Sequence, residues 1–91
     1  MYEITQYSKD QAKKLGVQIK PSTRKDKKID VFRNDKKLAS IGSKNMMDFP
    51  NYIKTKGIEY AKERRKLYKI RHEKDRHKKG TAGWFSDKIL W

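Results

Sequence analysis

The chain has 91 residues, and its 25 Lys and Arg against 11 Asp and Glu give a formal net charge of +14. This length allows one small domain over residues 1–91 with a thin core, and it excludes a deep substrate cleft. The sequence contains no cysteine, which excludes disulfides and cysteine-based zinc sites, and no signal peptide or transmembrane run is recognisable, so we expect a protein that is not secreted.

The first part of the chain predicts a short helix followed by a strand. Ser8 and Gln11 fit a capping box, in which the serine caps the helix and the glutamine reaches back to it. Gly16 fits a left-handed helix end, so we expect a helix over residues 9–15. The alternating pattern of residues 17–19 indicates a short strand, which Pro21 ends.

Residues 29–41 give the clearest hairpin pattern, with Asn34 and Asp35 as the turn. A two-residue loop would place Ile29 opposite Ser40. A three-residue loop would instead form the pairs Ile29–Ile41, Val31–Ala39 and Phe32–Leu38. We expect the three-residue loop because it gathers the apolar side chains on one face, and the buried face decides strand register.

Residues 48–79 predict one long helix that bends near Gly57. Pro50 fits the first turn after a cap at Asp48 or Phe49, and Gly80 fits the end. At about 100° per residue, one side of this helix is apolar and the opposite side is basic. The apolar side contains Ile53, Gly57, Tyr60, Ala61, Leu67 and Tyr68, and the basic side contains Lys54, Lys62, Arg65, Lys66, Lys69 and Arg76. We expect the apolar side to cover the hairpin.

Arg64 and Arg71 interrupt the apolar side. Either their stems lie along the core with the guanidinium groups in water, or they pair with a carboxylate of Asp30, Asp48 or Asp87. We favour the first arrangement, since a buried guanidinium without a partner is costly.

Residues 81–91 carry five large apolar side chains and follow a glycine at which the chain can turn back. Phe85 and Ile89 are four residues apart and share one face of a short helix, which we expect to pack onto the long helix. Trp91 either closes the core or docks on a partner chain, and we favour the core.

Residues 72–77 (HEKDRH) invite a metal-site or nuclease interpretation. Zinc-protease helices place two histidines four residues apart, whereas His72 and His77 are five apart and diverge by about 140° on a helix. Glu73 and Asp75 diverge as well. We therefore expect no catalytic residues, no metal site and no cofactor.

The strongest functional feature of the sequence is its positive charge, because a net charge of +14 is larger than solubility requires. Three basic sets could together face a nucleic-acid backbone. They are the loop residues Arg24, Lys25, Lys27 and Lys28, the hairpin-tip residues Arg33, Lys36 and Lys37, and the helix residues Lys62, Arg65, Lys66, Lys69 and Arg76. Such contacts give affinity and salt dependence but read little sequence.

Four segments cover most of the chain: YSKDQAKKLGVQIKPST (7–23), KIDVFRNDKKLASIG (28–42), FPNYIKTKGIEYAKERRKLYKIRHEKDRHKKG (49–80) and GWFSDKILW (83–91). They resemble a family of small basic proteins encoded by nucleocytoplasmic large DNA viruses, the giant viruses of algae and amoebae. The resemblance covers nearly the whole chain and supplies no catalytic residues. The turn of that family is often Asn-Gly, where this chain has Asn34-Asp35. The resemblance implies a viral protein that acts in the particle or inside the infected cell.

The sequence therefore predicts an α+β domain with a short helix, two or three antiparallel strands, a long basic helix and a C-terminal helix that packs back. We expect a non-enzymatic protein that binds DNA or RNA largely without sequence preference, in genome condensation or packaging, and that does not bind membrane. The alternative is a structural or cementing protein of a virus particle that binds acidic surfaces of virion proteins. A nuclease is a third, weaker hypothesis.

Overall fold

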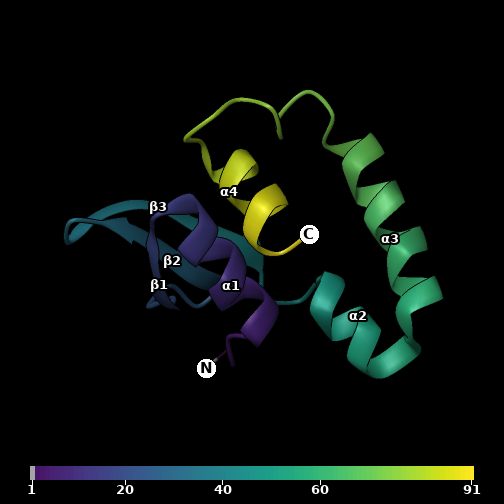
Figure 1. Ribbon diagram of the computed structural model, residues 1–91. Coiled ribbons are helices and arrows are strands. Elements are labelled where there is room, and N and C mark those ends of the chain that lie inside the picture. The colour runs from purple at the N-terminus through teal and green to yellow at the C-terminus, as the bar shows by residue number, and fades with distance from the viewer. Residues whose placement is uncertain (1) are drawn as a thin grey trace.

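An α+β fold is confirmed by the computed structural model, which describes residues 2–91. Within these residues the order along the chain is α1 (Gln6–Leu15), β1 (Gln18–Pro21), β2 (Lys27–Arg33), β3 (Lys36–Ser43), α2 (Phe49–Lys56), α3 (Ile58–Arg71) and α4 (Ala82–Ile89). Figure 1 shows two parts, with the sheet, α1 and α4 on one side and the pair α2 and α3 on the other.

The sheet has the antiparallel order β1-β2-β3, and its register combines the two alternatives that the sequence allowed. Asn34 and Asp35 have φ angles of 52° and 66°, as in a tight two-residue turn of a hairpin. Further from the turn, Ile29 pairs with Ile41 and Val31 with Ala39, as expected. The expected pair of Phe32 with Leu38 is wrong, because Phe32 lies opposite Lys37 and a β-bulge absorbs the extra residue.

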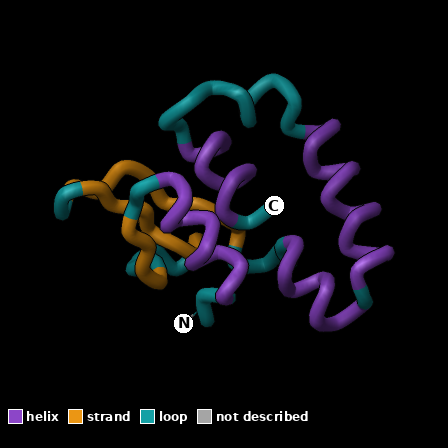
Figure 2. Tube along the Cα trace, viewed as in Figure 1, coloured by secondary structure: helices purple, strands orange, loops and turns teal. Residues whose placement is uncertain are grey.

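The core lies between the sheet and two helices, α1 and α4. It contains Ala12, Val17, Ile29, Val31, Ile41, Phe85, Ile89 and Leu90. The expectation that the long helix covers the sheet is wrong, since α4 occupies that position (Figure 2). Phe85 and Ile89 of α4 are buried in the core there. The two residues do share a face, as predicted, but this face meets the sheet instead of the long helix.

Helix α1 begins earlier than expected, because Thr5 is its cap. The Thr5 hydroxyl accepts a hydrogen bond from the Ser8 amide. Ser8 is itself buried, and its hydroxyl donates to the Ile89 carbonyl at 2.9 Å, while the Gln11 amide donates to the Lys88 carbonyl at 3.0 Å. The capping box is therefore wrong, and its two residues join α1 to the end of α4. The left-handed end at Gly16 is confirmed, with φ of 72°.

The expected long helix is two helices, α2 and α3. Asp48 caps α2 by accepting a hydrogen bond from the Asn51 amide, as the sequence indicated. At Gly57 the φ of 93° and ψ of 163° interrupt the helix, so α3 turns back along α2. The ring centres of Tyr52 in α2 and Tyr60 in α3 lie 5.6 Å apart. Helix α3 ends at Arg71, well before Gly80, and residues 72–80 form successive turns that lead the chain to α4.

Candidate nucleic-acid interface

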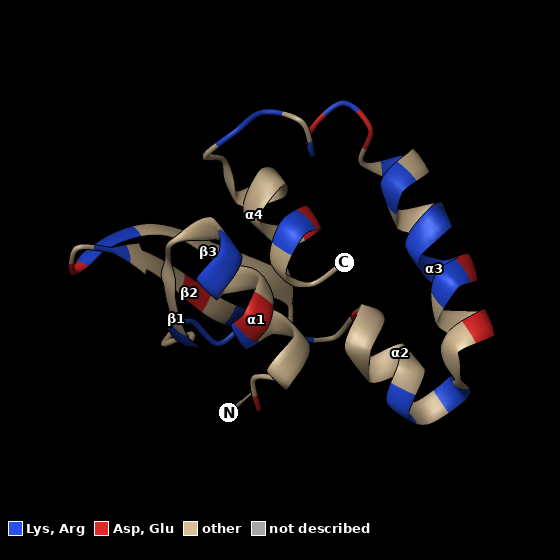
Figure 3. Ribbon diagram, in the orientation of Figure 1, with Lys and Arg blue, Asp and Glu red and all other residues tan. Residues whose placement is uncertain are grey.

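The basic side of α3 lines a shallow groove. All five of its predicted members from Lys62 onward contribute to a hollow of about 610 Å³, which also includes Ile70 and Glu73. The five are Lys62, Arg65, Lys66, Lys69 and Arg76. Figure 3 shows Lys and Arg recurring along the length of α3. Helical spacing brings the first four together, whereas Arg76 lies beyond the end of α3 and is held there by the Lys69 carbonyl and Asp87.

Three of these five cations are anchored by contacts within the protein. Lys69 donates to Asp87 at 2.7 Å, and Arg76 lies 3.8 Å from the same carboxylate and 2.7 Å from Glu73. The Arg65 guanidinium lies 4.1 Å from the centre of the Phe49 ring. Lys62 and Lys66 are exposed, and no carboxylate of residues 2–91 lies within salt-bridge distance of either. The groove thus combines three anchored cations with two exposed lysines.

Asp87 is the anchor of the groove, although the sequence suggested it only as a partner of Arg64 or Arg71. Its side chain is 1% exposed and is surrounded by Lys69, Arg76 and, at 3.8 Å, Lys88. One carboxylate oxygen, Oδ2, accepts no hydrogen bond from residues 2–91, although two of these cations lie near it. Since Asp87 belongs to α4 and Lys69 to α3, this carboxylate fixes the basic groove to the rest of the domain.

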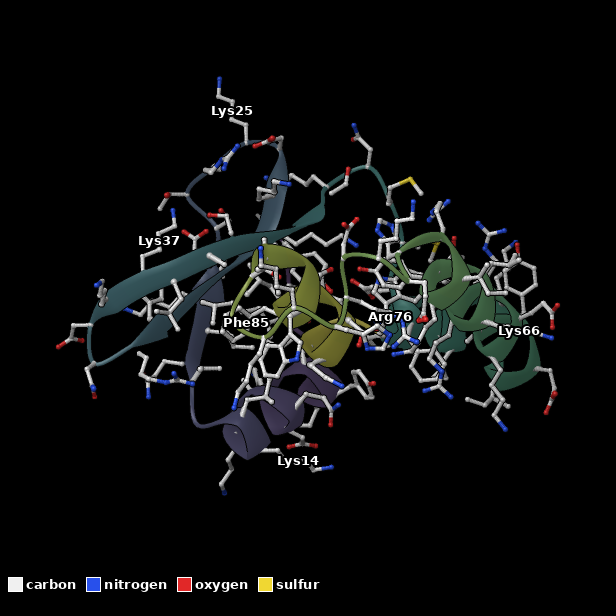
Figure 4. The ribbon with its side chains drawn as sticks, turned by 90° about the horizontal axis from the view of Figure 1, so that it is seen from above. Lys14, Lys25, Lys37, Lys66, Arg76 and Phe85 are labelled. Atoms are coloured by element: carbon white, nitrogen blue, oxygen red, sulfur yellow. The ribbon has the colours of Figure 1, made fainter. Side chains whose placement is uncertain are left out.

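The hairpin-tip cations lie at the opposite end of the molecule from α3. Arg33, Lys36 and Lys37 are exposed, and Lys37 lies 3.5 Å from Asp30. The domain extends 37 Å along its longest axis, and Figures 1 and 4 both place the hairpin tip and α3 at its two ends. The three basic sets therefore do not form one continuous patch, which is where the sequence interpretation fails.

The loop set divides into exposed and buried residues. Arg24 and Lys25 are exposed, with Arg24 3.5 Å from Asp26, and Figure 4 shows Lys25 pointing away from the body of the protein. Lys27 is half-buried. Lys28 is buried, and its ammonium bonds to Asp48 at 3.0 Å, so its position in the fold does not suit contact with an external phosphate.

Within residues 72–77, Glu73 and His77 contact side chains of the same segment, whereas Arg76 also reaches Asp87 of α4. Glu73 accepts from Arg76 and lies 2.8 Å from the His77 ring nitrogen. The hydrogen bond with His77, aided by the nearby Arg76, holds the pKa of Glu73 below its ordinary value. In the described part of the chain, no three His, Asp or Glu side chains cluster as metal ligands do.

No protein-family model, curated protein or solved structure matches this chain. Among residues 2–91, none of the helices combines the length and the apolar character needed to cross a membrane.

Proposed function

We propose that this protein binds DNA or RNA through the backbone phosphates, without catalysis and largely without sequence preference. The observation that carries the proposal is the groove of α3, in which five cationic side chains line one surface. The viral setting implied by the sequence resemblance, with genome condensation or packaging as the task, remains part of the proposal.

The geometry of the groove favours phosphate contacts over base recognition. Lys62 and Lys66 are exposed lysines without a carboxylate partner in the described residues, and a lysine ammonium binds phosphate as a mobile point charge. Lys69 and Arg76 are held near a buried carboxylate, so they add positive potential from fixed positions. Contacts of this kind position a backbone and carry no direct sequence information.

The test is a fluorescence-anisotropy titration of labelled duplex DNA at several salt concentrations. If the five groove cations each neutralise one phosphate, log K should fall against log salt with a slope of about −4 to −5. The variant Lys62→Gln/Lys66→Gln should flatten this slope by about 2, since each lost phosphate contact removes about one unit.

The matched control is Lys13→Gln/Lys14→Gln, which removes the same charge from the exposed last turn of α1. This control should leave the slope near that of the parent protein. Equal effects of the two double variants would mean that overall charge attracts DNA and that the groove is no site. An affinity that does not change with salt would reject phosphate binding altogether.

A further inference from the structure

A second face of α3 exposes apolar side chains outside the core, and of those named here only Ile70 also lines the basic groove. Tyr60, Leu67 and Ile70 are 46%, 47% and 65% exposed, and Met46, before α2, is 47% exposed. Ile58 is the fifth exposed large hydrophobic residue of the described chain and also belongs to α3, but at about 100° per residue it lies on the basic side of the helix. Apolar side chains gathered in this way mark an interaction surface more often than scattered ones do.

Tyr60, Arg64, Leu67 and Arg71, which we call the seam, are spaced by four, three and four residues. This is the spacing of a coiled-coil contact line, with apolar and cationic residues alternating along it. At about 100° per residue, the centre of the seam lies about 160° around α3 from the mean direction of Lys62, Lys66 and Lys69. The buried stripe that contains Ala61 and Tyr68 separates the two faces on one side.

The seam borders a hollow of about 340 Å³ beside the C-terminal residue. Tyr68 and Trp91 both line it and stack on each other with ring centres 4.4 Å apart and planes 10° apart. Met46, Leu67 and Ile70 add apolar lining, and Arg64 and Arg71 add two guanidinium groups. The hollow therefore offers a stacked aromatic pair, aliphatic side chains and two positive charges.

The two arginines indicate the chemistry of the occupant. The Arg64 guanidinium lies 5.7 Å from the centre of the Tyr52 ring, and neither Arg64 nor Arg71 has a carboxylate within salt-bridge distance in residues 2–91. By contrast, the buried carboxylates of Asp48 and Asp87 are already bonded to lysines. An occupant that brings its own carboxylates would complement the arginines. A second copy of this chain would bring another net +14 to the interface.

We propose that the seam docks an acidic amphipathic helix of a protein partner. The facing positions of this helix alternate between an apolar residue that enters the hollow and a Glu or Asp that meets Arg64 or Arg71. Helix-in-groove recognition uses anchors with this periodicity. The proposal stands apart from nucleic-acid binding, because it uses a different face of α3.

The test uses the full chain and two synthetic helical peptides of about two heptads with the same composition. In one peptide Leu and Glu alternate at the seam-facing positions, and in the other the same residues are permuted so that no apolar stripe forms. Binding is measured by anisotropy of labelled peptide at about 0.3 M salt, which screens attraction by net charge alone. The patterned peptide should bind at least about tenfold more tightly than the permuted one.

Two variants locate the site. Leu67→Gln changes an exposed seam residue and should abolish the preference for the patterned peptide, whereas the neighbouring Lys66→Gln should preserve it. Circular dichroism of both variants checks that the fold is retained. Equal binding of the two peptides, or a preference that survives Leu67→Gln, would overturn the proposal. Dimerisation through the seam in sedimentation equilibrium, or Leu67-dependent binding to anionic vesicles in place of peptide, would overturn it as well.

Discussion

The buried ion pair of Lys28 and Asp48 allows a direct test of which cations support the fold. The two side chains are 5% and 1% exposed and their N–O distance is 3.0 Å. Asp48 also accepts hydrogen bonds from the Tyr2 hydroxyl at 2.6 Å and from the Asn51 backbone and side-chain amides at 3.2 and 2.7 Å. The carboxylate thus joins the N-terminus, β2 and α2.

The informative substitution is Lys28→Met, because methionine keeps most of the lysine stem and removes the charge. Removing one partner of a buried pair costs about 3–5 kcal/mol, since the other charge is left without compensation. The hydrogen bonds that remain on Asp48 place this variant near the lower end, at about 3 kcal/mol. A domain of this size should then lose roughly 12–24 °C in Tm.

The assay is urea unfolding followed by tryptophan fluorescence, with Lys25→Met as the matched control. Lys25 is exposed in the preceding loop, so the control removes the same charge and should change the free energy of unfolding by less than about 0.5 kcal/mol. The double variant Lys28→Met/Asp48→Asn should recover part of the loss, because the uncompensated carboxylate is gone and asparagine still caps a helix. If Lys28→Met is as stable as Lys25→Met, the assignment of Lys28 to the interior is refuted.

Two further predictions concern the other buried carboxylates. Burial alone would raise the pKa of Asp30, but hydrogen bonds from Ser22, Ser40 and the Thr23 amide, together with Lys37, hold this pKa below its ordinary value. Ionised Asp30 therefore stabilises the fold at neutral pH, and this contribution is lost as pH falls through the folded-state pKa. Asp30→Asn should accordingly be less stable than the parent at pH 7, with a smaller difference below about pH 4 in urea unfolding; a constant difference would contradict the argument. Asp87→Asn should cost about 1–3 kcal/mol and speed hydrogen exchange in α3, since Lys69 and Arg76 lose their anchor. If hydrogen exchange in the sheet accelerated equally, Asp87 would stabilise the whole core and not α3 in particular.

The sequence predicted those features that depend on near neighbours in the chain. Gly16 ends α1, Asn34 and Asp35 form the turn, Asp48 caps α2, and Phe85 and Ile89 share a buried face. Each follows from backbone preference or helical spacing within a few residues. The same local reasoning placed four of the five groove cations together, those that belong to α3.

The errors arise where distant segments decide the outcome. Residues 72–79 are compatible with a helix, yet α3 ends at Arg71 and the chain returns to α4. The returning chain packs closely against these turns, since a Cβ on Gly83 would lie 3.1 Å from the Asp75 carbonyl oxygen. Lys28 looked like part of a basic loop, and its burial depends on a carboxylate 20 positions away. No local pattern distinguishes a lysine that pairs with Asp48 from one that contacts solvent.

The placement of the acidic residues explains how a domain with this excess of positive charge can keep a stable fold and a basic surface. Asp30, Asp48 and Asp87 are buried, and each bonds to or lies beside a cation from another part of the chain. Asp48 neutralises Lys28 in the interior, where an unpaired lysine would be most costly, whereas Asp30 and Asp87 lie beside the partly exposed Lys37 and Lys69. Lys62 and Lys66, by contrast, are exposed at the surface of α3, where an ammonium stays hydrated. The net charge therefore does not distinguish a buried, paired lysine from an exposed one. Loss of Lys28 should lower the stability of the fold, whereas loss of Lys66 should weaken binding.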